Sequence, residues 1–180
     1  IRRTIESLPR PLPGNFPPTT FELLTLTAFL LFQQAGCRYA VVETGIGGRL
    51  DATNVLSPLA CLLTPLDLEH TELLGPSLEA IAQEKGGIIK PGVPVFCGFQ
   101  APEVRRIFSR IAVERGAPCA FLDEEVEHLE SRVSDSGTRL TITLRGGGPA
   151  SFGLRLPGRF QAENAALAAL ALTRVVPDIP

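Results

Sequence analysis

The sequence has few of the residues that build a structural metal site. Its four cysteines are far apart in the 180-residue chain, none belongs to a Cys-x-x-Cys pair, and there are only two histidines. A structural zinc site takes four such ligands at short spacings, so we expect none. Scattered cysteines of this kind are typical of a reducing compartment, which predicts buried free thiols and a cytoplasmic location.

The sequence also lacks a strong net charge and a long apolar run. A formal net charge of -2 offers no attraction for nucleic acid or for an anionic membrane. The sequence contains no run of about twenty apolar residues, which is the length that a membrane-spanning helix needs. The apolar stretch after residue 20 contains Glu22 and ends at Gln33 and Gln34, which argues against a signal peptide. We therefore expect neither nucleic acid nor a membrane as a partner. The chain is also expected to be a monomer.

Methionine is missing altogether, even from the first position, and the chain opens on IRRTIESLPRPLPG. This absence predicts a piece of a longer protein. Residues 1–20 are rich in turn-forming prolines and are expected to form an irregular linker, with one domain over residues 21–180. A hydrophobic content of 44% with 20% charged residues fits an ordinary globular core.

Short apolar runs alternate with helical patterns along the chain. The runs predict strands buried on both faces of a parallel sheet, at 39–44, 60–66, 93–99 and 118–123. The predicted helices are one capped by Thr19 or Thr20 and ended by Gly36, then 77–88 capped by Ser77, 102–115 and 160–176. Alternating polar and apolar residues over 125–156 predict an antiparallel hairpin at the sheet's edge. The expected fold class is α/β, a doubly wound, mostly parallel sheet flanked by helices.

One stretch, VVETGIGGRLDATN at 41–54, places a carboxylate at the end of a predicted strand and a glycine-rich loop after it. A dinucleotide-binding fingerprint would need a glycine where Leu50 stands. It would also need a helix, which LDATNVLSP is not expected to start because Pro58 breaks it. The dinucleotide interpretation is therefore disfavoured.

A cation site is a better interpretation of these strand ends. Glu43 ends one predicted strand, and Asp67, Glu69 and His70 follow the next. Ligands of open α/β sheets bind beyond the carboxyl ends of the strands, so these side chains could converge there. Oxygen ligands with one imidazole suit Mg²⁺ or Mn²⁺. Taken singly, each residue has a structural alternative, since Glu43 could end a strand in water and His70 could cap a turn.

Two further polar residues leave alternatives open. Lys85, in IAQEKGGIIK, is either a lysine near the metal edge or a solvated helix lysine paired with Glu84 or Gln83. Asn164, near the start of the last predicted helix, is either a ligand-binding amide or a helix cap.

Four segments together resemble one family. FELLTLTAFLLF, VVETGIGGRLDATNVL, LEHTELLGPSLEAIAQEKGGIIKPGVPV and GRFQAENAALAALAL occur in the order seen in folylpolyglutamate synthases and dihydrofolate synthases of the Mur ligase superfamily. The resemblance covers most of the chain from Thr19 and is weakest over 102–154. It implies an ATP-dependent ligase that phosphorylates the carboxylate of dihydropteroate or a folate and joins the acyl phosphate to L-glutamate.

The resemblance also implies a set of metal ligands. Glu43 and His70 would hold Mg²⁺, and Lys85 would be carbamylated by CO₂ to give an anionic ligand. Carbamylation needs the neutral amine, which burial among Ile81, Ile88 and Ile89 would favour.

For the substrates, the resemblance places Asn164 and, less firmly, Gln161 near the adenine of ATP. It places Phe21 and Ala52 against the pterin, with Asp51 and Asn54 shaping the loop. The loop glycines would let the backbone approach the substrate closely.

The chain departs from the family pattern in several places. Glu69-His70 stands where the family usually has Asp-His, and Asp67 stands where a small residue is common. The phosphate-binding GTNGKGS loop is missing, since no Gly-Lys dipeptide occurs in the sequence, and the family's C-terminal domain would begin beyond the last residues. We expect the central portion of a ligase, inactive by itself. A non-catalytic binding module is the alternative; a Mur-type ligase of another pathway fits the fold but not the GGRLDATN block.

Overall fold

The structure is a computed structural model that describes residues 17–176. The chain divides into two compact units, Ile1–Leu56 and Ser57–Pro180. Most of the expected linker, residues 1–16, lies outside the described residues. The single domain expected over 21–180 stays a prediction.

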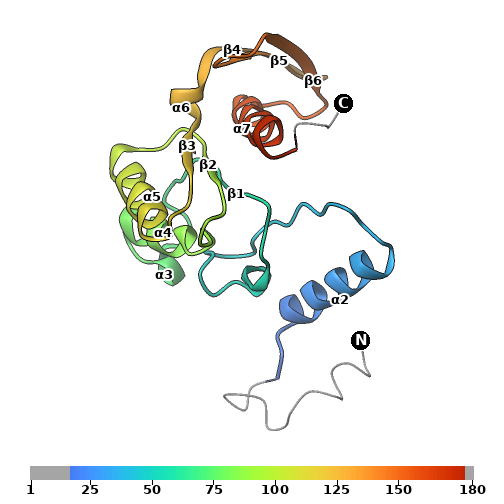
Figure 1. The fold of residues 1–180 in the computed structure, drawn as a ribbon, viewed down its shortest axis with the longest axis vertical. Helices are drawn as coiled ribbons and strands as arrows, with labels where there is room; N and C mark the ends of the chain where they lie inside the picture. The colour runs from blue at the N-terminus through green and yellow to red at the C-terminus, as the bar shows by residue number, and fades with distance from the viewer. Residues whose placement is uncertain (1–16, 177–180) are drawn as a thin grey trace. The chain divides into compact units, whose positions relative to one another are not determined.

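The first unit contains one long helix, α2 (Thr20–Gln34), which begins as its sequence predicts (Figure 1). The Thr19 hydroxyl accepts from the Glu22 N–H at 3.2 Å, and the Glu22 carboxylate accepts from the Thr19 N–H at 2.7 Å. This reciprocal capping box satisfies two backbone groups that the first turn leaves free. None of the residues of α2 is buried.

The segment 39–44 is not a strand, so the prediction made for it is wrong. Its backbone is irregular, and Val41 is fully exposed. A buried parallel strand exists only when a neighbouring strand bonds to it, and residues 39–44 pair with no other strand among residues 17–176. The apolar run alone therefore does not make a strand here.

A short helix does start in LDATNVLSP, contrary to expectation. It is the 3₁₀ helix η2 (Ala52–Val55), and Asp51 caps it by accepting from the Thr53 N–H. The expectation considered only a full α-helix, which Pro58 does prevent, whereas one 3₁₀ turn ends before the proline.

The second unit contains a parallel sheet of three short strands in the order β1-β2-β3. The strands are β1 (Cys61–Leu63), β2 (Val95–Cys97) and β3 (Cys119–Phe121). The connections between them carry α3 (Thr71–Leu74), α4 (Leu78–Gly86) and α5 (Pro102–Glu114). Ser77 caps α4 as predicted, since its hydroxyl accepts from the Ala80 N–H at 3.3 Å.

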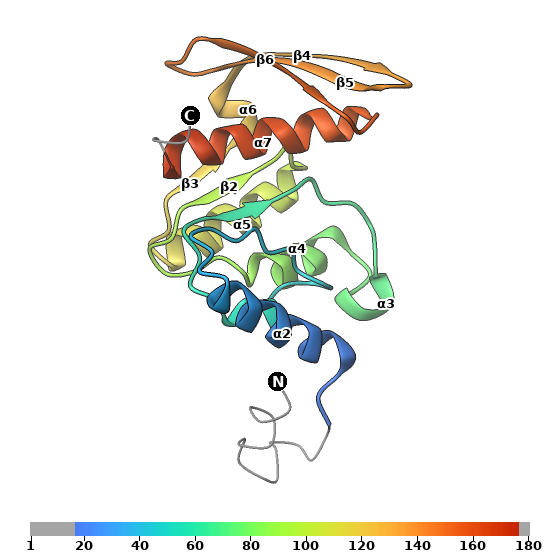
Figure 2. The ribbon, with the colours of Figure 1, turned by 90° about the vertical axis from the view of Figure 1, so that its right-hand side faces the viewer.

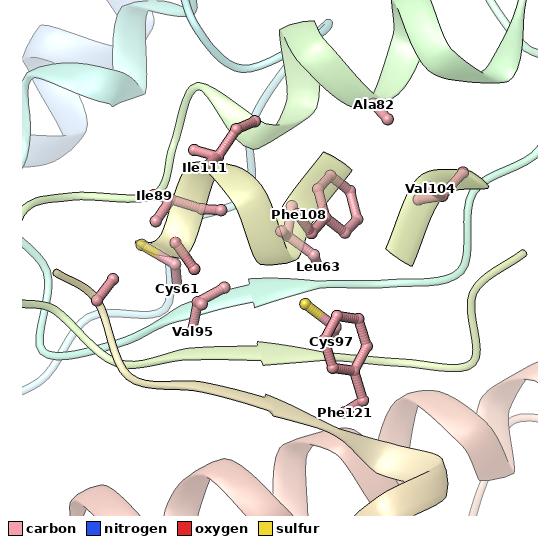
Figure 3. Packing of buried hydrophobic residues seen from close by; sticks show 12 residues of the cluster. Cys61, Leu63, Ala82, Ile89, Val95, Cys97, Val104, Phe108, Ile111 and Phe121 are labelled. Carbon is pink, nitrogen blue, oxygen red and sulfur yellow. The ribbon is translucent and has the colours of Figure 1, made fainter. Parts of the chain in front are cut away.

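Helices cover both faces of this sheet, as a doubly wound fold requires. On one face, Val95 and Cys97 pack with residues of α4 and α5 around Phe108, which is fully buried (Figure 3). On the other face, Phe96 packs with Leu167 of α7 (Arg159–Val175). Successive strand residues thus serve opposite faces, which is why the strands read as continuous apolar runs.

The antiparallel segment forms a sheet of its own rather than an edge hairpin. It comprises β4 (Val126–Ser134), β5 (Gly137–Leu144) and β6 (Pro149–Leu154), which pair in that order and are preceded by the short helix α6 (Leu122–Glu125). Ile142 packs against α7, which lies between the two sheets (Figure 2). The expected hairpin, with RLTITLR as a strand and GGGP as its turn, is the antiparallel β5–β6 pair. The additional strand β4 and the separate layer were not predicted.

All four cysteines are free, as expected, but only Cys61 and Cys97 are buried. Cys119 is half-buried and Cys37 is exposed, so the expectation of uniformly buried thiols is wrong for these two. Within residues 17–176, no helix has the length and apolar character needed to span a lipid bilayer.

Candidate functional site

The loop between β1 and α3 carries Glu69 and His70, and it brings Glu69 close to Lys85. The Lys85 side-chain nitrogen on α4 lies 3.0 Å from a Glu69 carboxylate oxygen. This ion pair comes from the loop before α3, whereas the structural alternative had looked for a partner beside Lys85 on the helix. The Lys85 side chain is 22% exposed and therefore half-buried, and its burial among the isoleucines stays a prediction.

His70 holds an unusual backbone conformation at the end of this loop. Its φ is 51°, in the left-handed region that residues other than glycine rarely occupy. It stands at the N-cap position of α3, and its carbonyl accepts from the N–H groups of Leu73 and Leu74, both at 2.9 Å. Its side chain makes no capping hydrogen bond, so the imidazole does not serve as the turn's cap.

Glu43 is exposed and lies in irregular backbone of the first unit. Glu43 does not end a strand. The alternative in which it ends a strand in water is therefore wrong, and so is the argument that used its place at a strand end to predict a metal site. Because Glu43 and His70 belong to different units, their convergence on one cation stays a prediction.

The types of donor present fit a small divalent cation. A carboxylate and an imidazole suit Mg²⁺ or Mn²⁺ better than zinc. Within residues 17–176, no three histidine, cysteine, aspartate or glutamate side chains are grouped so that they could hold a metal.

A second cluster forms in the first unit around Asp51. Its Oδ2 accepts from the N–H groups of Gly45 at 2.9 Å and Ile46 at 3.2 Å, and its Oδ1 accepts from the Thr53 N–H at 2.9 Å and the Thr53 hydroxyl at 2.5 Å. Partial burial raises the pKa of Asp51, but these hydrogen bonds outweigh burial and hold the pKa below its ordinary value. The ionised carboxylate thus ties the glycine loop to η2.

Phe21 packs directly on this loop. A Cβ added to Gly45 would lie 2.7 Å from the Phe21 ring and 3.0 Å from Asp51 Oδ2, so only glycine leaves room for the ring. Ala52 is half-buried in η2, and the Asn54 side chain donates to the Arg49 carbonyl at 3.0 Å. The structure therefore brings the residues expected at the pterin into one loop and the helix end beside it.

The residues expected near adenine lie in the first two turns of α7. Gln161 and Asn164 are three residues apart, so they share one side of the helix, and both are half-buried. The N-cap residue is Gly158, which excludes a capping role for Asn164. Buried Thr138 fixes this helix start, because its hydroxyl donates to the Leu156 carbonyl at 3.0 Å and accepts from the Gly158 N–H at 3.0 Å.

Two residues that organise these sites were missed in the sequence, Thr138 and Gln100. The Gln100 side chain bonds to the segment that leads out of β1. A signal for Gln100 was present, because it follows a predicted strand and polar residues at strand ends are candidates for a site. Nothing in the pattern around Thr138 distinguishes it from other strand threonines.

The model of the Mur ligase middle domain matches residues 12–172. The chain belongs to this family. Among curated proteins, the folylpolyglutamate synthase of Lacticaseibacillus casei is 32% identical over 93% of this chain and 39% of its own length. The dihydrofolate synthase/folylpolyglutamate synthase of Bacillus subtilis (strain 168) is 34% identical over 86% of this chain and 36% of its own length. The chain thus spans about two-fifths of the length of these relatives.

A solved structure confirms the fold class. The structure described as an FPGS-AMPPCP-folate complex superposes with a TM-score of 0.87 and 31% identity, over 98% of this chain and 43% of that one. The α/β architecture, with a parallel sheet and an antiparallel sheet, is therefore that of a Mur ligase middle domain, and the resemblance to the synthases is confirmed.

Proposed function

We propose that this chain is the central part of an ATP-dependent ligase that adds L-glutamate to dihydropteroate, to a folate, or to both. The observation that carries the proposal is its match, over 98% of its length, to a synthase complex described as holding AMPPCP and folate. In this reaction ATP phosphorylates the acid substrate's carboxylate. The amino group of glutamate then attacks the acyl phosphate, an amide forms, and inorganic phosphate leaves.

The structure supports separate roles for three groups of residues. Glu43 and His70, with Lys85 as its carbamate, would hold Mg²⁺, which when bound offsets negative charge on the phosphates. Gln161 and Asn164 present two amides from one side of α7, which suits the donors and acceptors of adenine. Phe21 offers a ring that is 44% exposed for stacking on a pterin, beside the backbone of Gly45.

Asp51 and Asn54 act on this substrate site through the backbone. Asp51 holds the Gly45 and Ile46 N–H groups in place, and Asn54 bonds to the Arg49 carbonyl. Ala52 forms the start of the helical turn between them. The loop is thus fixed before substrate arrives, which lowers the ordering cost of binding.

The phosphate-binding loop has no counterpart in this sequence, which contains no Gly-Lys dipeptide. We propose that sequence outside the chain supplies it, and that the 180-residue chain alone neither hydrolyses ATP nor forms the amide. Loss of the loop's charge-assisted hydrogen bonds, roughly 1.5–3 kcal/mol each, should leave ATP binding weaker than micromolar in calorimetry. The free cysteines favour the cytoplasm, and the ligase is proposed to act as a monomer.

The decisive experiment assays the protein encoded by the whole reading frame. ADP release is measured with ATP and L-glutamate, comparing dihydropteroate and tetrahydrofolate as the acid substrate. Lys85→Arg should abolish turnover, because a guanidinium cannot become an anionic ligand, while Lys90→Arg, at the only other lysine in this sequence, should retain it. Lys85→Ala should be partly rescued by acetate.

Other outcomes would select other functions. Near-normal turnover in Lys85→Arg would overturn the carbamate role. Binding of folate without any amide formation would indicate a non-catalytic binding module. ADP release that depends on another acid and amine, with no response to folates, would indicate a Mur-type ligase of another pathway.

A further inference from the structure

Gln100 lies just beyond the carboxyl end of β2, and its side-chain amide is bonded to the chain leaving β1. Nε2 donates to the Leu63 carbonyl at 3.3 Å and to the Thr64 carbonyl at 2.8 Å. Oε1 accepts from the Leu66 N–H at 3.2 Å. Both donors and the acceptor of the amide are therefore used on one short stretch of backbone.

That stretch begins the loop that carries Glu69 and His70. Other contacts hold the same end of the loop, because the Gly98 N–H donates to the Leu63 carbonyl at 2.8 Å. Pro65 packs so closely on Gly98 that an added Cβ would lie 2.8 Å from its ring. At the far end, Glu69 is paired with Lys85 and His70 stands in a left-handed conformation. A residue in that region persists only when its surroundings fix it.

We propose that Gln100 is a positioning residue, whose amide fixes the start of the 64–70 loop so that the His70 imidazole is presented to the metal ion. This inference rests on the proposed function, in which His70 is a metal ligand. The chemistry requires a glutamine. A glutamate would keep the acceptor for Leu66 but would direct a second oxygen at the carbonyls of Leu63 and Thr64, and an alanine would leave all three groups without their partner.

The chain carries its own control for the test, because His70 and His128 are its two histidines and His128 is exposed on β4. Mn²⁺ is added to the 180-residue chain, and the paramagnetic broadening of the two imidazole Cε1–H proton signals is followed by NMR. In the unaltered chain the His70 signal should broaden at a Mn²⁺ concentration that leaves His128 sharp. In Gln100→Ala and Gln100→Glu, the Mn²⁺ concentration for half-broadening of His70 should rise roughly 10–100-fold.

Matched variants separate this role from a general loss of stability. Gln83→Ala and Gln83→Glu change the same residue type at an exposed position of α4 and should leave the broadening unchanged. All spectra are taken well below each variant's unfolding temperature, with the shifted methyl signals around buried Phe108 as the marker of a folded core. If Gln100→Ala does not fold, Gly98→Ala disturbs the same loop through Pro65 and should weaken His70 broadening in the same way.

The outcomes distinguish the inference from the function on which it rests. If Mn²⁺ broadens the His70 signal selectively, and to the same extent in the unaltered chain and in folded Gln100 variants, only the positioning role of Gln100 is overturned. Equal broadening of both histidines in the unaltered chain overturns His70 as a metal ligand, and the role of Gln100 with it. A 10-fold or larger loss confined to the Gln100 and Gly98 variants supports the proposal.

Discussion

The side-chain nitrogen of Lys85 lies 3.0 Å from a carboxylate oxygen of Glu69, which holds this lysine as an ion-paired cation. Carbamylation would turn the same side chain into an anion, and a carboxylate so close opposes an anion. The cationic and carbamylated states of Lys85 therefore compete, and Glu69 favours the first unless a bound metal ion lies between them.

Removing the Glu69 charge should shift this competition. We expect Glu69→Gln to raise the carbamylated fraction of Lys85 roughly two- to fivefold, the modest size reflecting an ion pair that solvent reaches. The measurement is the carbamate signal in ¹³C NMR after addition of ¹³C-bicarbonate, with Lys85→Arg to identify the signal against Lys90.

The control for this prediction is Glu72→Gln, which removes an exposed carboxylate from the neighbouring short helix α3. It should leave the carbamate signal as in the unaltered chain. An unchanged signal in Glu69→Gln would show that the ion pair has no influence on carbamylation.

The Asp51 carboxylate should make the stability of the glycine loop depend on pH. Its folded-state pKa is lowered, so its contribution is complete above the unfolded value near ~3.9 and is lost as pH falls through the lower folded value. In Asp51→Asn an NH₂ group replaces one of the two accepting oxygens. This group cannot accept the N–H or hydroxyl hydrogen bonds that the oxygen accepted. In this variant we expect faster hydrogen exchange at the amides of Gly45, Ile46 and Thr53. We expect no further loss of loop stability as the pH falls.

Asp135→Asn is the matched control for the loop, since Asp135 is exposed in a turn of the second unit. In Asp135→Asn, hydrogen exchange at the amides around Asp51 should equal that of the unaltered chain at every pH. Exchange at Gly45 that is the same in Asp51→Asn and in the unaltered chain would mean that the carboxylate does not hold the loop.

Phe108 should be a large contributor to the stability of the second unit. Its side chain is fully buried between the parallel sheet and α4, where a Cβ on Gly86 would lie 3.5 Å from its ring. Phe108→Ala should lower the free energy of unfolding by about 3–5 kcal/mol in urea titration, because it leaves a cavity. Val113→Ala on the same helix, where the side chain is 80% exposed, should cost far less. A loss below about 1 kcal/mol in Phe108→Ala would contradict this packing.

The sequence predicted the helices well because their signals are local. Thr19 with Glu22 and Ser77 with Ala80 are contacts within one turn, so residue type and spacing are enough to place them. The segment 39–44 failed because a strand depends on a partner elsewhere in the chain, and apolar character does not supply one.

The sequence predicted which residues belong to the candidate site better than it predicted which of them contact one another. The family pattern selected Lys85 and His70. Local spacing offered Glu84 or Gln83 as one alternative for the partner of Lys85, whereas Glu69, which pairs with it, comes from the preceding loop. The sequence marks Gln100 only as a polar residue after a predicted strand, because its role depends on two strands that end side by side. Such contacts follow from the sheet's register, which a single sequence does not fix.

Gly45 should be required for binding of the pterin part of the substrate. A methyl group there would lie 2.7 Å from the Phe21 ring, and the ring would have to move from the loop it packs on. In the protein encoded by the whole reading frame, we expect Gly45→Ala to weaken folate binding roughly tenfold or more while ATP binding stays unchanged. Gly153→Ala, where an added Cβ meets nothing within 4 Å, is the control and should bind both as before. Calorimetric titration with each ligand measures the two affinities, and an unaltered folate affinity in Gly45→Ala would exclude Phe21 and Gly45 from the substrate site.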